Sequence, residues 1–563
     1  MAKRSVLVIG SGAGGSVAAW ALAVTGHAVL ILEKGRNLFP GLGTKAGVGS
    51  LFANDEVKGG RYFENQDVQL EPRTFRTQAD ASQGKARSQV GDVNNLPTTV
   101  GGGTVHWDAK TPRFWRQDFK GLSLFGPVQG ANVADWPLAY EDLAPYYDEV
   151  EARLGVQGDV GRMPARTLAQ APRAQQFAMA PNPPIYGGLL LAEGARKLGY
   201  SAYPFPMAIN SRPFHGRPRC NSCGFCSGFG CPINARGGAA VSFLHQALLA
   251  GARLEPRSNV YRVDTTANGR RATGVAYRDA GGAERTESAD IIILAGSAIE
   301  TARLLLLSAN GAHPDGLGNR SGQVGRNLMF HHFTAGVGVF AEQVHAWRGP
   351  STTFTLDDFV GPDLGPAAKA AGLPYLKGGI CEVGGSFLLL QEAQAYASTP
   401  NSWGKTHKTM MRASLLRDHI AGISMLGEDM PQLGNRVDLD PDIKDVYGVQ
   451  VPRITRSPHA FELAASKAIA PKLAAICRAA PGAIGAFHLS GDNAVPLAGT
   501  AHLMGTARMG DDPGTSVVDP HGQMNELDNV FIADGSVSPS SGGFNPTLTI
   551  MALSLRMARH LGG

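Results

Sequence analysis

Four cysteines lie close together in the middle of the chain, in the segment CNSCGFCSGFGCP. They are Cys220, Cys223, Cys226 and Cys231, and the whole chain has six. Their C-x2-C-x2-C-x4-C-P spacing is one residue longer than a run that holds iron–sulfur clusters. Four thiolates also bind zinc, although a zinc ribbon needs two separated pairs. The segment therefore predicts an iron–sulfur cluster or a structural loop that carries thiols, and zinc or disulfides fit it less well.

A second chemical pattern lies at the N-terminus, in SVLVIGSGAGG, where Gly10, Gly12 and Gly15 fit G-x-G-x-x-G. An apolar run over residues 6–9 precedes these glycines, and an Ala-rich stretch over residues 16–25 follows them. This order predicts a buried strand, a tight turn and a helix whose N-terminal amides receive a pyrophosphate. The pattern predicts a dinucleotide site.

The next apolar run, residues 28–32, predicts a second strand that ends at Glu33. An acidic side chain at this place accepts hydrogen bonds from ribose hydroxyls. It also disfavours the 2′-phosphate of NADP, while the glycine motif itself does not separate FAD from NAD.

Glycines and aromatic side chains meet again in TTVGGGTVHWDAK, residues 98–110. A glycine-rich backbone exposes amides and leaves room for a flat ring to approach. The residues expected beside such a ring are Gly102, Gly103, Thr104, His106 and Trp107. The composition of this segment fits a ring-binding loop or an ordinary turn before a strand.

The C-terminal part contains a histidine and an asparagine whose side chains can hold or move a proton on an oxygen. His502 lies in AHLMGTARMGDDPG, and Asn545 stands before a helix expected from about Thr547. Oxidation of an alcohol needs a base for the hydroxyl proton, which a neutral histidine provides, and a second polar side chain on the same oxygen. Pro546 is tolerated in the first turn of that helix.

A helix N-terminus also stabilises negative charge on a group bound in front of it. Just upstream, residues 530–533 predict a strand, and Asp534-Gly535-Ser536 its turn. We expect Asp534 to hold ribityl or pyrophosphate-side groups of the cofactor by hydrogen bonding.

Together these segments resemble the glucose–methanol–choline (GMC) oxidoreductases, a family of FAD enzymes. The nearest branch is that of pyranose 2-oxidase and bacterial FAD-dependent glucose, gluconate and glycoside dehydrogenases, which share G-G-x-x-x-H-W and a segment similar to residues 135–151. Residues 289–311 resemble the second family signature, and Val260 matches a valine that contacts the adenine. The resemblance covers most of the chain, and it is weakest in the regions that would shape the pocket.

The resemblance implies FAD as the cofactor and His502 with Asn545 as the catalytic pair. His502 would take the hydroxyl proton, Asn545 would orient the hydroxyl, and hydride would pass to flavin N5. His106 matches a histidine that is bonded covalently to the flavin in pyranose 2-oxidases and is not bonded in the dehydrogenases, so both alternatives stay open. His331 and His332 are adjacent and would face opposite sides of a strand, so we expect no metal pair there.

The same resemblance does not decide whether the four cysteines hold an iron–sulfur cluster. Catalytic subunits of related glucose and fructose dehydrogenases carry a three-iron–four-sulfur cluster on cysteines in this region, whereas long-chain alcohol oxidases have a comparable loop without one. A cluster would pass electrons to a cytochrome or quinone. Structural thiols would favour oxygen or a soluble acceptor.

The expected fold is α+β, with a Rossmann-like FAD-binding domain and a substrate domain built on an antiparallel sheet. The FAD-binding domain is expected over residues 1–330 and 481–563, and the substrate-binding domain over residues 331–480. Within the FAD-binding domain, inserted loops are expected at residues 37–91, 160–219 and 220–232, the last being the Cys-rich loop.

Bulk composition predicts a large folded protein of 563 residues, with 43% hydrophobic and 18% charged residues. A net charge of +5 without a basic run argues against nucleic-acid binding. No apolar stretch reaches about 18 residues, which predicts no transmembrane helix. Few cysteines favour the cytoplasm by default, or the periplasm if a small signal-bearing escort subunit exports the chain.

The predicted function is FAD-dependent oxidation of a CH–OH group of a sugar, glycoside or related alcohol, with a cytochrome, quinone or oxygen as electron acceptor. The alternative is an oxygen-using oxidase of aryl or long-chain alcohols whose Cys loop is purely structural. The sequence leaves open the substrate, the regiochemistry and the oligomeric state.

Overall fold

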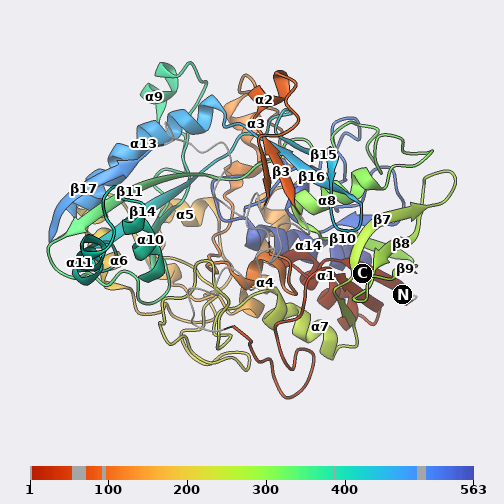
Figure 1. Cartoon of the computed structure of the whole chain (residues 1–563), viewed down its shortest axis with the longest axis horizontal. Helices are drawn as coiled ribbons and strands as arrows, with labels where there is room; N and C mark the ends of the chain where they lie inside the picture. The colour runs from red at the N-terminus through yellow and green to blue at the C-terminus, as the bar shows by residue number, and fades with distance from the viewer. Residues whose placement is uncertain (1–2, 53–71, 92–96, 386–388, 491–501, 563) are drawn as a thin grey trace.

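The computed structural model describes residues 3–52, 72–91, 97–385, 389–490 and 502–562. Figure 1 shows two regions side by side, one with helices α1 (Ala13–Val24) and α14 (Thr547–Gly562), the other with helix α13 (Ala460–Ala479) along one edge. Both α1 and α14 come from the ends of the chain and pack against each other. The first region is therefore built from both ends of the chain, and it is complete only when the C-terminal helix packs against the N-terminal one.

A five-stranded parallel sheet forms the first region. Its order is β18 (Val530–Ile532), β10 (Ile291–Leu294), β1 (Ser5–Ile9), β2 (Ala28–Glu33) and β6 (Arg253–Pro256). The central strands are apolar and buried, as expected for a parallel sheet covered on both faces. The strands expected at residues 6–9, 28–32 and 530–533 and the helix from Thr547 are confirmed.

An antiparallel three-stranded sheet lies beside this region, with α8 (Ser297–Leu307) packed on its first strand. Its strands are β7 (Asn259–Thr265), β8 (Ala272–Arg278) and β9 (Glu284–Glu287). Helix α4 (Tyr140–Leu154) packs against α14 and covers the first region from another side.

The second region is a six-stranded, fully antiparallel sheet. Its order is β17 (Ala483–Leu489), β11 (His332–Phe340), β14 (Ile420–Gly427), β13 (Cys381–Val383), β12 (Phe354–Leu356) and β5 (Tyr203–Pro204). Helix α13 packs on β11, and α6 (Tyr186–Lys197) packs on α13. The expected antiparallel substrate sheet is confirmed, and its edge strands β17 and β5 extend beyond residues 331–480.

A further four-stranded sheet joins segments from both parts of the sequence. It consists of β15 (Arg436–Lys444), β16 (Gln450–Thr455), β3 (Arg73–Arg76) and β4 (Gln89–Gly91). The remaining α-helices are α2 (Gln78–Ser82), α3 (Gly121–Phe125), α5 (Ala165–Gln170), α7 (His245–Leu249), α9 (Gly365–Ala370), α10 (Leu389–Ala397), α11 (Lys405–Ala413) and α12 (Leu415–Asp418). In the described part of the chain, no helix combines the length and apolarity needed to cross a bilayer.

The glycine motif after β1 is packed against backbone from two other strands. Gly10 has φ +101°, and a Cβ on it would lie 2.4 Å from the carbonyl oxygen of Ala295, just after β10. A Cβ on Gly14 would lie 1.6 Å from the carbonyl oxygen of Ala533, just after β18. Both contacts are with backbone, so neither neighbour can rotate away to make room for a side chain.

We therefore expect Gly14→Ala to destabilise the folded protein by about 3 kcal/mol or more, as for overpacking against a rigid neighbour. Chemical denaturation of the holoprotein measures this loss. Gly311→Ala is the matched control, because its Cβ meets no atom within 4 Å. An equal stability for Gly14→Ala and Gly311→Ala would contradict the packing described above.

Candidate active site

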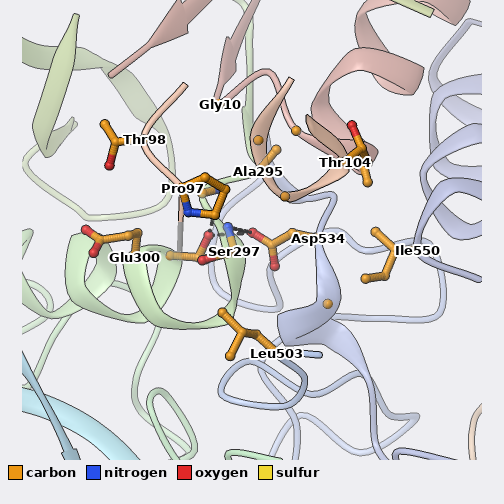
Figure 2. A pocket seen from close by; sticks show the side chains of 18 of the residues that line it. Gly10, Pro97, Thr98, Thr104, Ala295, Ser297, Glu300, Leu503, Asp534 and Ile550 are labelled. Atoms are coloured by element: carbon orange, nitrogen blue, oxygen red, sulfur yellow. Dashed lines mark hydrogen bonds between the residues drawn. The ribbon is translucent and has the colours of Figure 1, made fainter. Parts of the chain in front are cut away.

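A cavity of about 600 Å³ lies where the carboxyl ends of the parallel strands meet the antiparallel sheet. Figure 2 shows part of its wall, with Gly10, Ala295 and Thr104 above and Leu503 below a central pair, Ser297 and Asp534. Every residue that the sequence assigned to FAD binding or catalysis lines this cavity, except Gly15. Gly15 lies behind the wall, where its Cβ would be 2.0 Å from the Gly10 carbonyl oxygen.

Glu33 ends β2 at the wall of the cavity, as the motif predicts. Its Oε2 accepts hydrogen bonds from the Ser11 amide (2.9 Å) and hydroxyl (2.7 Å), and its Oε1 accepts one from the Gly35 amide (2.7 Å). Burial raises the pKa of this carboxyl, and these hydrogen bonds oppose the rise. Its contact with a ribose stays a prediction, as does the adenine contact of Val260, which also lines the cavity.

Asp534 is buried and joins the loop after β18 to the start of α8. Its Oδ2 accepts hydrogen bonds from the Ser297 amide (2.9 Å; Figure 2) and the Thr301 hydroxyl (2.6 Å). Its Oδ1 accepts two more, from the Ser536 amide (2.9 Å) and hydroxyl (2.5 Å). Four protein donors thus fix this carboxylate, and its expected hydrogen bonds to the cofactor stay a prediction.

The second glycine loop passes close to the first. Gly102 has φ +53°, and its Cβ would lie 2.8 Å from the Cα of Gly12. A Cβ on the next residue, Gly103, would meet no protein atom within 4 Å, although this residue lines the cavity. The two loops therefore form a bare backbone wall. A large flat group or a pyrophosphate can lie directly against it.

The side chains that follow this loop are held by backbone. Thr104 donates to the Gly101 carbonyl (2.7 Å) and accepts from the Ala239 amide (2.9 Å). Trp107 donates from Nε1 to the Gly237 carbonyl (2.9 Å). Burial, and next the positive charge of Arg236, lower the pKa of His106 to about 4, so this imidazole is neutral near pH 7. Whether His106 is bonded to a flavin stays open.

The wall fits FAD. The N-terminus of α1 has no side-chain cap, so its first amides remain available to a pyrophosphate. Gly10, Gly12 and Gly103 leave the approach to these amides clear, and Pro546 and Thr547 bring the start of α14 to the same cavity. The residues that would hold FAD are thus the ones the sequence motifs indicate.

His502 packs against a histidine that the sequence gave no reason to choose. The Nδ1 atoms of His331 and His502 are 2.9 Å apart, and the Nε2 of His331 lies 3.2 Å from the carbonyl oxygen of Ser541. Burial lowers the pKa of His331 to about 4. Burial, together with the neighbouring His331 and Lys110, lowers the pKa of His502 well below its ordinary value. Both rings are therefore neutral near pH 7.

These contacts define which nitrogen of His502 carries its proton. A carbonyl oxygen only accepts, so the Nε2 of His331 carries the proton of that ring, and its Nδ1 is an acceptor. The Nδ1 of His502 must then donate to it. The Nε2 of neutral His502 is left without a proton, which is the form that a catalytic base requires.

The side-chain amide of Asn545 is held by a buried carboxylate, that of Glu382. Its Nδ2 donates to the Oε1 of Glu382 (3.1 Å), and its Oδ1 is buried with no hydrogen-bond partner in the described ranges. The Oε2 of Glu382 is 2.5 Å from the Lys110 ammonium, which also lies 2.8 Å from the Oδ2 of Asp108. All four of these residues line the cavity.

Charge within this group is strongly stabilised. Burial alone would lower the pKa of Lys110, but Asp108 and Glu382 reverse this and raise it. Burial alone would raise the pKa of Asp108, but Lys110 and hydrogen bonds from Ser227 (2.9 Å) and Ser351 (3.0 Å) bring it to about 2. Asp108, Lys110 and Glu382 could not be recognised from the sequence. Asp108 and Lys110 lie within residues 98–110, where their charge was the only signal, and Glu382 had none.

The Cys-rich loop lies beside this group, through Ser227. Arg236 is buried under the loop and donates to the carbonyl oxygens of Cys226 (2.6 Å) and Phe229 (2.5 Å). Burial raises the pKa of the Cys226 thiol, which disfavours its thiolate. Among the described residues, no group of three or more Cys, His, Asp or Glu side chains is arranged to hold a metal ion. Whether the four cysteines hold an iron–sulfur cluster stays open.

Comparison with known proteins identifies the family. Residues 129–333 and 431–554 match the GMC oxidoreductase family, and residues 8–77 match a NAD(P)-binding Rossmann-like domain. The 2-methyl-1,2-propanediol dehydrogenase of Mycolicibacterium austroafricanum is 30% identical over 99% of this chain and 95% of its own. Paromamine 6'-oxidase of Streptomyces fradiae is 31% identical over 99% of this chain and 91% of its own.

Other relatives agree with this assignment. The fructose dehydrogenase large subunit of Gluconobacter japonicus is 31% identical over 82% of this chain and 79% of its own. Formate oxidase of Aspergillus oryzae RIB40 has the same fold, with a TM-score of 0.67 at 15% identity over 99% of this chain and 98% of that one. The chain belongs to the GMC oxidoreductase family. It is an FAD-dependent oxidoreductase that acts on CH–OH donors.

The lowered pKa of His502 predicts how activity depends on pH. If His502 is the base that the sequence predicts, its protonation stops the reaction, and burial with His331 and Lys110 moves that protonation below the ordinary histidine pKa of 6.5. We therefore expect kcat/KM for an alcohol substrate to stay constant as the pH is lowered to 6.5. It should fall only at pH values below 6.5. Stopped-flow flavin reduction across the acid range measures this, with flavin absorbance as the check that FAD stays bound. A fall centred at or above pH 6.5 would contradict it.

Proposed function

We propose that this enzyme oxidises a secondary or primary alcohol of a sugar, glycoside or related polyol, with His502 as the base. The observation that carries the proposal is the His331–His502 pair, because it leaves the Nε2 of His502 unprotonated inside the cavity that fits FAD. Relatives named for a 1,2-diol, a sugar and an aminoglycoside support this class of substrate.

Each residue then has a defined task. FAD, when bound, supplies the acceptor for the hydride. The Nε2 of His502 takes the hydroxyl proton, and the hydrogen bond to His331 keeps the ring oriented and in the correct tautomer. The helix that begins at Thr547 adds the positive end of its dipole to the cavity, which favours negative charge there. Asn545 holds the substrate beside the base.

Electrons leave the reduced enzyme to an acceptor that the site does not identify. We propose oxygen or a small soluble acceptor, because burial disfavours the thiolate of Cys226 and Arg236 holds the loop through its backbone carbonyls. The loop instead serves as a wall, held by Arg236 beneath and by the Ser227–Asp108 hydrogen bond at its side. A dehydrogenase that uses a cytochrome or quinone remains the alternative outcome of the assays below.

His502→Ala tests the base. We expect the rate of anaerobic flavin reduction by an alcohol substrate to fall by about 10²- to 10⁴-fold, the usual contribution of a general base, while FAD content is unchanged. His313→Gln is a control, because His313 is also buried and bonded to a carbonyl but lies outside the cavity. Full turnover by His502→Ala would overturn the mechanism.

Iron and acid-labile sulfide in anaerobically purified protein test the Cys loop. We expect a flavin spectrum without a broad added background, and iron well below one atom per chain. About three irons and matching sulfide per chain would overturn the structural role of the loop. Parallel turnover assays with oxygen and with a dye acceptor then decide between the oxidase and the dehydrogenase.

A further inference from the structure

The amide of Asn545 is oriented by a charged group that is itself clamped. The Lys110 ammonium lies 2.5 Å from one oxygen of Glu382, and the other oxygen accepts the Nδ2 of Asn545 at 3.1 Å. A carboxylate beside an ammonium has no proton to give, so the nitrogen of Asn545 must face it. The amide cannot rotate by half a turn without placing its oxygen against a carboxylate.

This clamp turns the oxygen of Asn545 away from Glu382. Oδ1 is buried, and no residue in the described part of the chain donates a hydrogen bond to it. Buried polar atoms of this kind are costly unless a ligand or water satisfies them. Since Asn545 lines the same cavity as His502, a donor group on a molecule bound there is one way to satisfy Oδ1.

The hydroxyl that is oxidised cannot be this donor. It has one proton, and under the proposed function that proton goes to the Nε2 of His502. Donation to Oδ1 of Asn545 therefore needs a second N–H or O–H group on the substrate. A hydroxyl or ammonium on a neighbouring carbon would supply it.

We propose that Asn545 is a hydrogen-bond acceptor for a second donor next to the oxidised carbon, and that Glu382 and Lys110 are the positioning residues that hold it so. The substrate class is then vicinal diols and vicinal amino alcohols, as parts of polyols or sugars. This inference rests on the proposed function for the role of His502. It departs from the simpler expectation that Asn545 donates to the reacting oxygen, because its nitrogen is already bonded to Glu382.

Binding to a catalytically disabled holoenzyme tests the acceptor without turnover. In His502→Ala, calorimetry would compare trans-1,2-cyclohexanediol and trans-2-aminocyclohexanol with cyclohexanol and trans-2-methoxycyclohexanol. The methoxy compound places an oxygen at the same position but cannot donate. We expect the two donor compounds to bind about tenfold or more tightly than the other two, the value of one satisfied buried hydrogen bond.

Two further variants test whether Asn545 and Glu382 cause the tighter binding of the diol and the amino alcohol. Adding Asn545→Ala should remove the preference for the donor compounds. The diol and the amino alcohol should then bind only as tightly as cyclohexanol. Adding Glu382→Gln should reduce the preference, because a glutamine amide no longer forces the nitrogen of Asn545 toward it. The matched control is Glu428→Gln, which alters another buried Lys bridge, with Lys377 2.9 Å from Glu428 and 3.0 Å from Asp118, outside the cavity. The control should keep the preference.

Equal binding of the diol and its methoxy analogue, a preference that survives Asn545→Ala, or no binding of any of the compounds would overturn the inference. Its failure differs from a failure of the proposed function. If the diol preference holds in His502→Ala but no alcohol reduces the flavin of the native enzyme, then the acceptor role stands and the proposed oxidation fails. If the native enzyme oxidises all of these alcohols without any preference in binding, the acceptor role fails and the oxidation stands.

Discussion

The contact of the first glycine turn with the backbone after β10 and β18 is the constraint on which the rest of the structure depends. Gly10 and Gly14 lie against the carbonyls of Ala295 and Ala533 with no space for a side chain. These contacts bring together the carboxyl ends of strands that are hundreds of residues apart in the chain. They also bring Asp534, the start of α8 and the start of α14 to one cavity. Without this close approach, the wall that fits FAD would not exist.

The cavity also depends on ion pairs and hydrogen bonds among the polar side chains that line it. Asp108, Lys110 and Glu382 form a buried group in which an ammonium lies between two carboxylates. Loss of one partner would leave an uncompensated buried charge, which is far more costly than loss of a surface ion pair. The same group connects the Cys-rich loop, through Ser227, to the amide of Asn545. The loop and the amide of Asn545 are therefore coupled by hydrogen bonds and ion pairs.

The neighbouring His331 and His502, the first buried and the second half-buried, illustrate how loss of solvent keeps an imidazole neutral. A histidine in water is partly protonated near neutral pH, whereas loss of solvent keeps His331 and His502 neutral, and the neighbouring His331 lowers the pKa of His502 further. The carbonyl of Ser541 then selects the tautomer of His331, and His331 selects that of His502. A chain of two hydrogen bonds thus determines where the proton acceptor lies.

Local patterns in the sequence were sufficient to determine the cofactor wall. Gly10, Gly12, Glu33, Gly103 and Thr547 could be identified because a strand, a tight turn and a helix N-terminus need particular residues at fixed short spacings. His502 and Asn545 could be named only through resemblance to a family, since neither has a diagnostic neighbour. The parallel and antiparallel sheets followed from apolar runs and from the same resemblance.

Only the tertiary structure decided which side chains act on these residues. His331 lies 171 positions from His502, and Glu382 lies 163 positions from Asn545 and 272 from Lys110. No spacing rule links such residues, because their contact depends on how two sheets pack rather than on the period of one helix or strand. The sequence by itself therefore predicted where FAD would bind, and the residues it named for that site, except Gly15, line one cavity. The fold decided which nitrogen of His502 is left unprotonated and which atom of Asn545 is bonded to Glu382, because both depend on hydrogen bonds between distant segments.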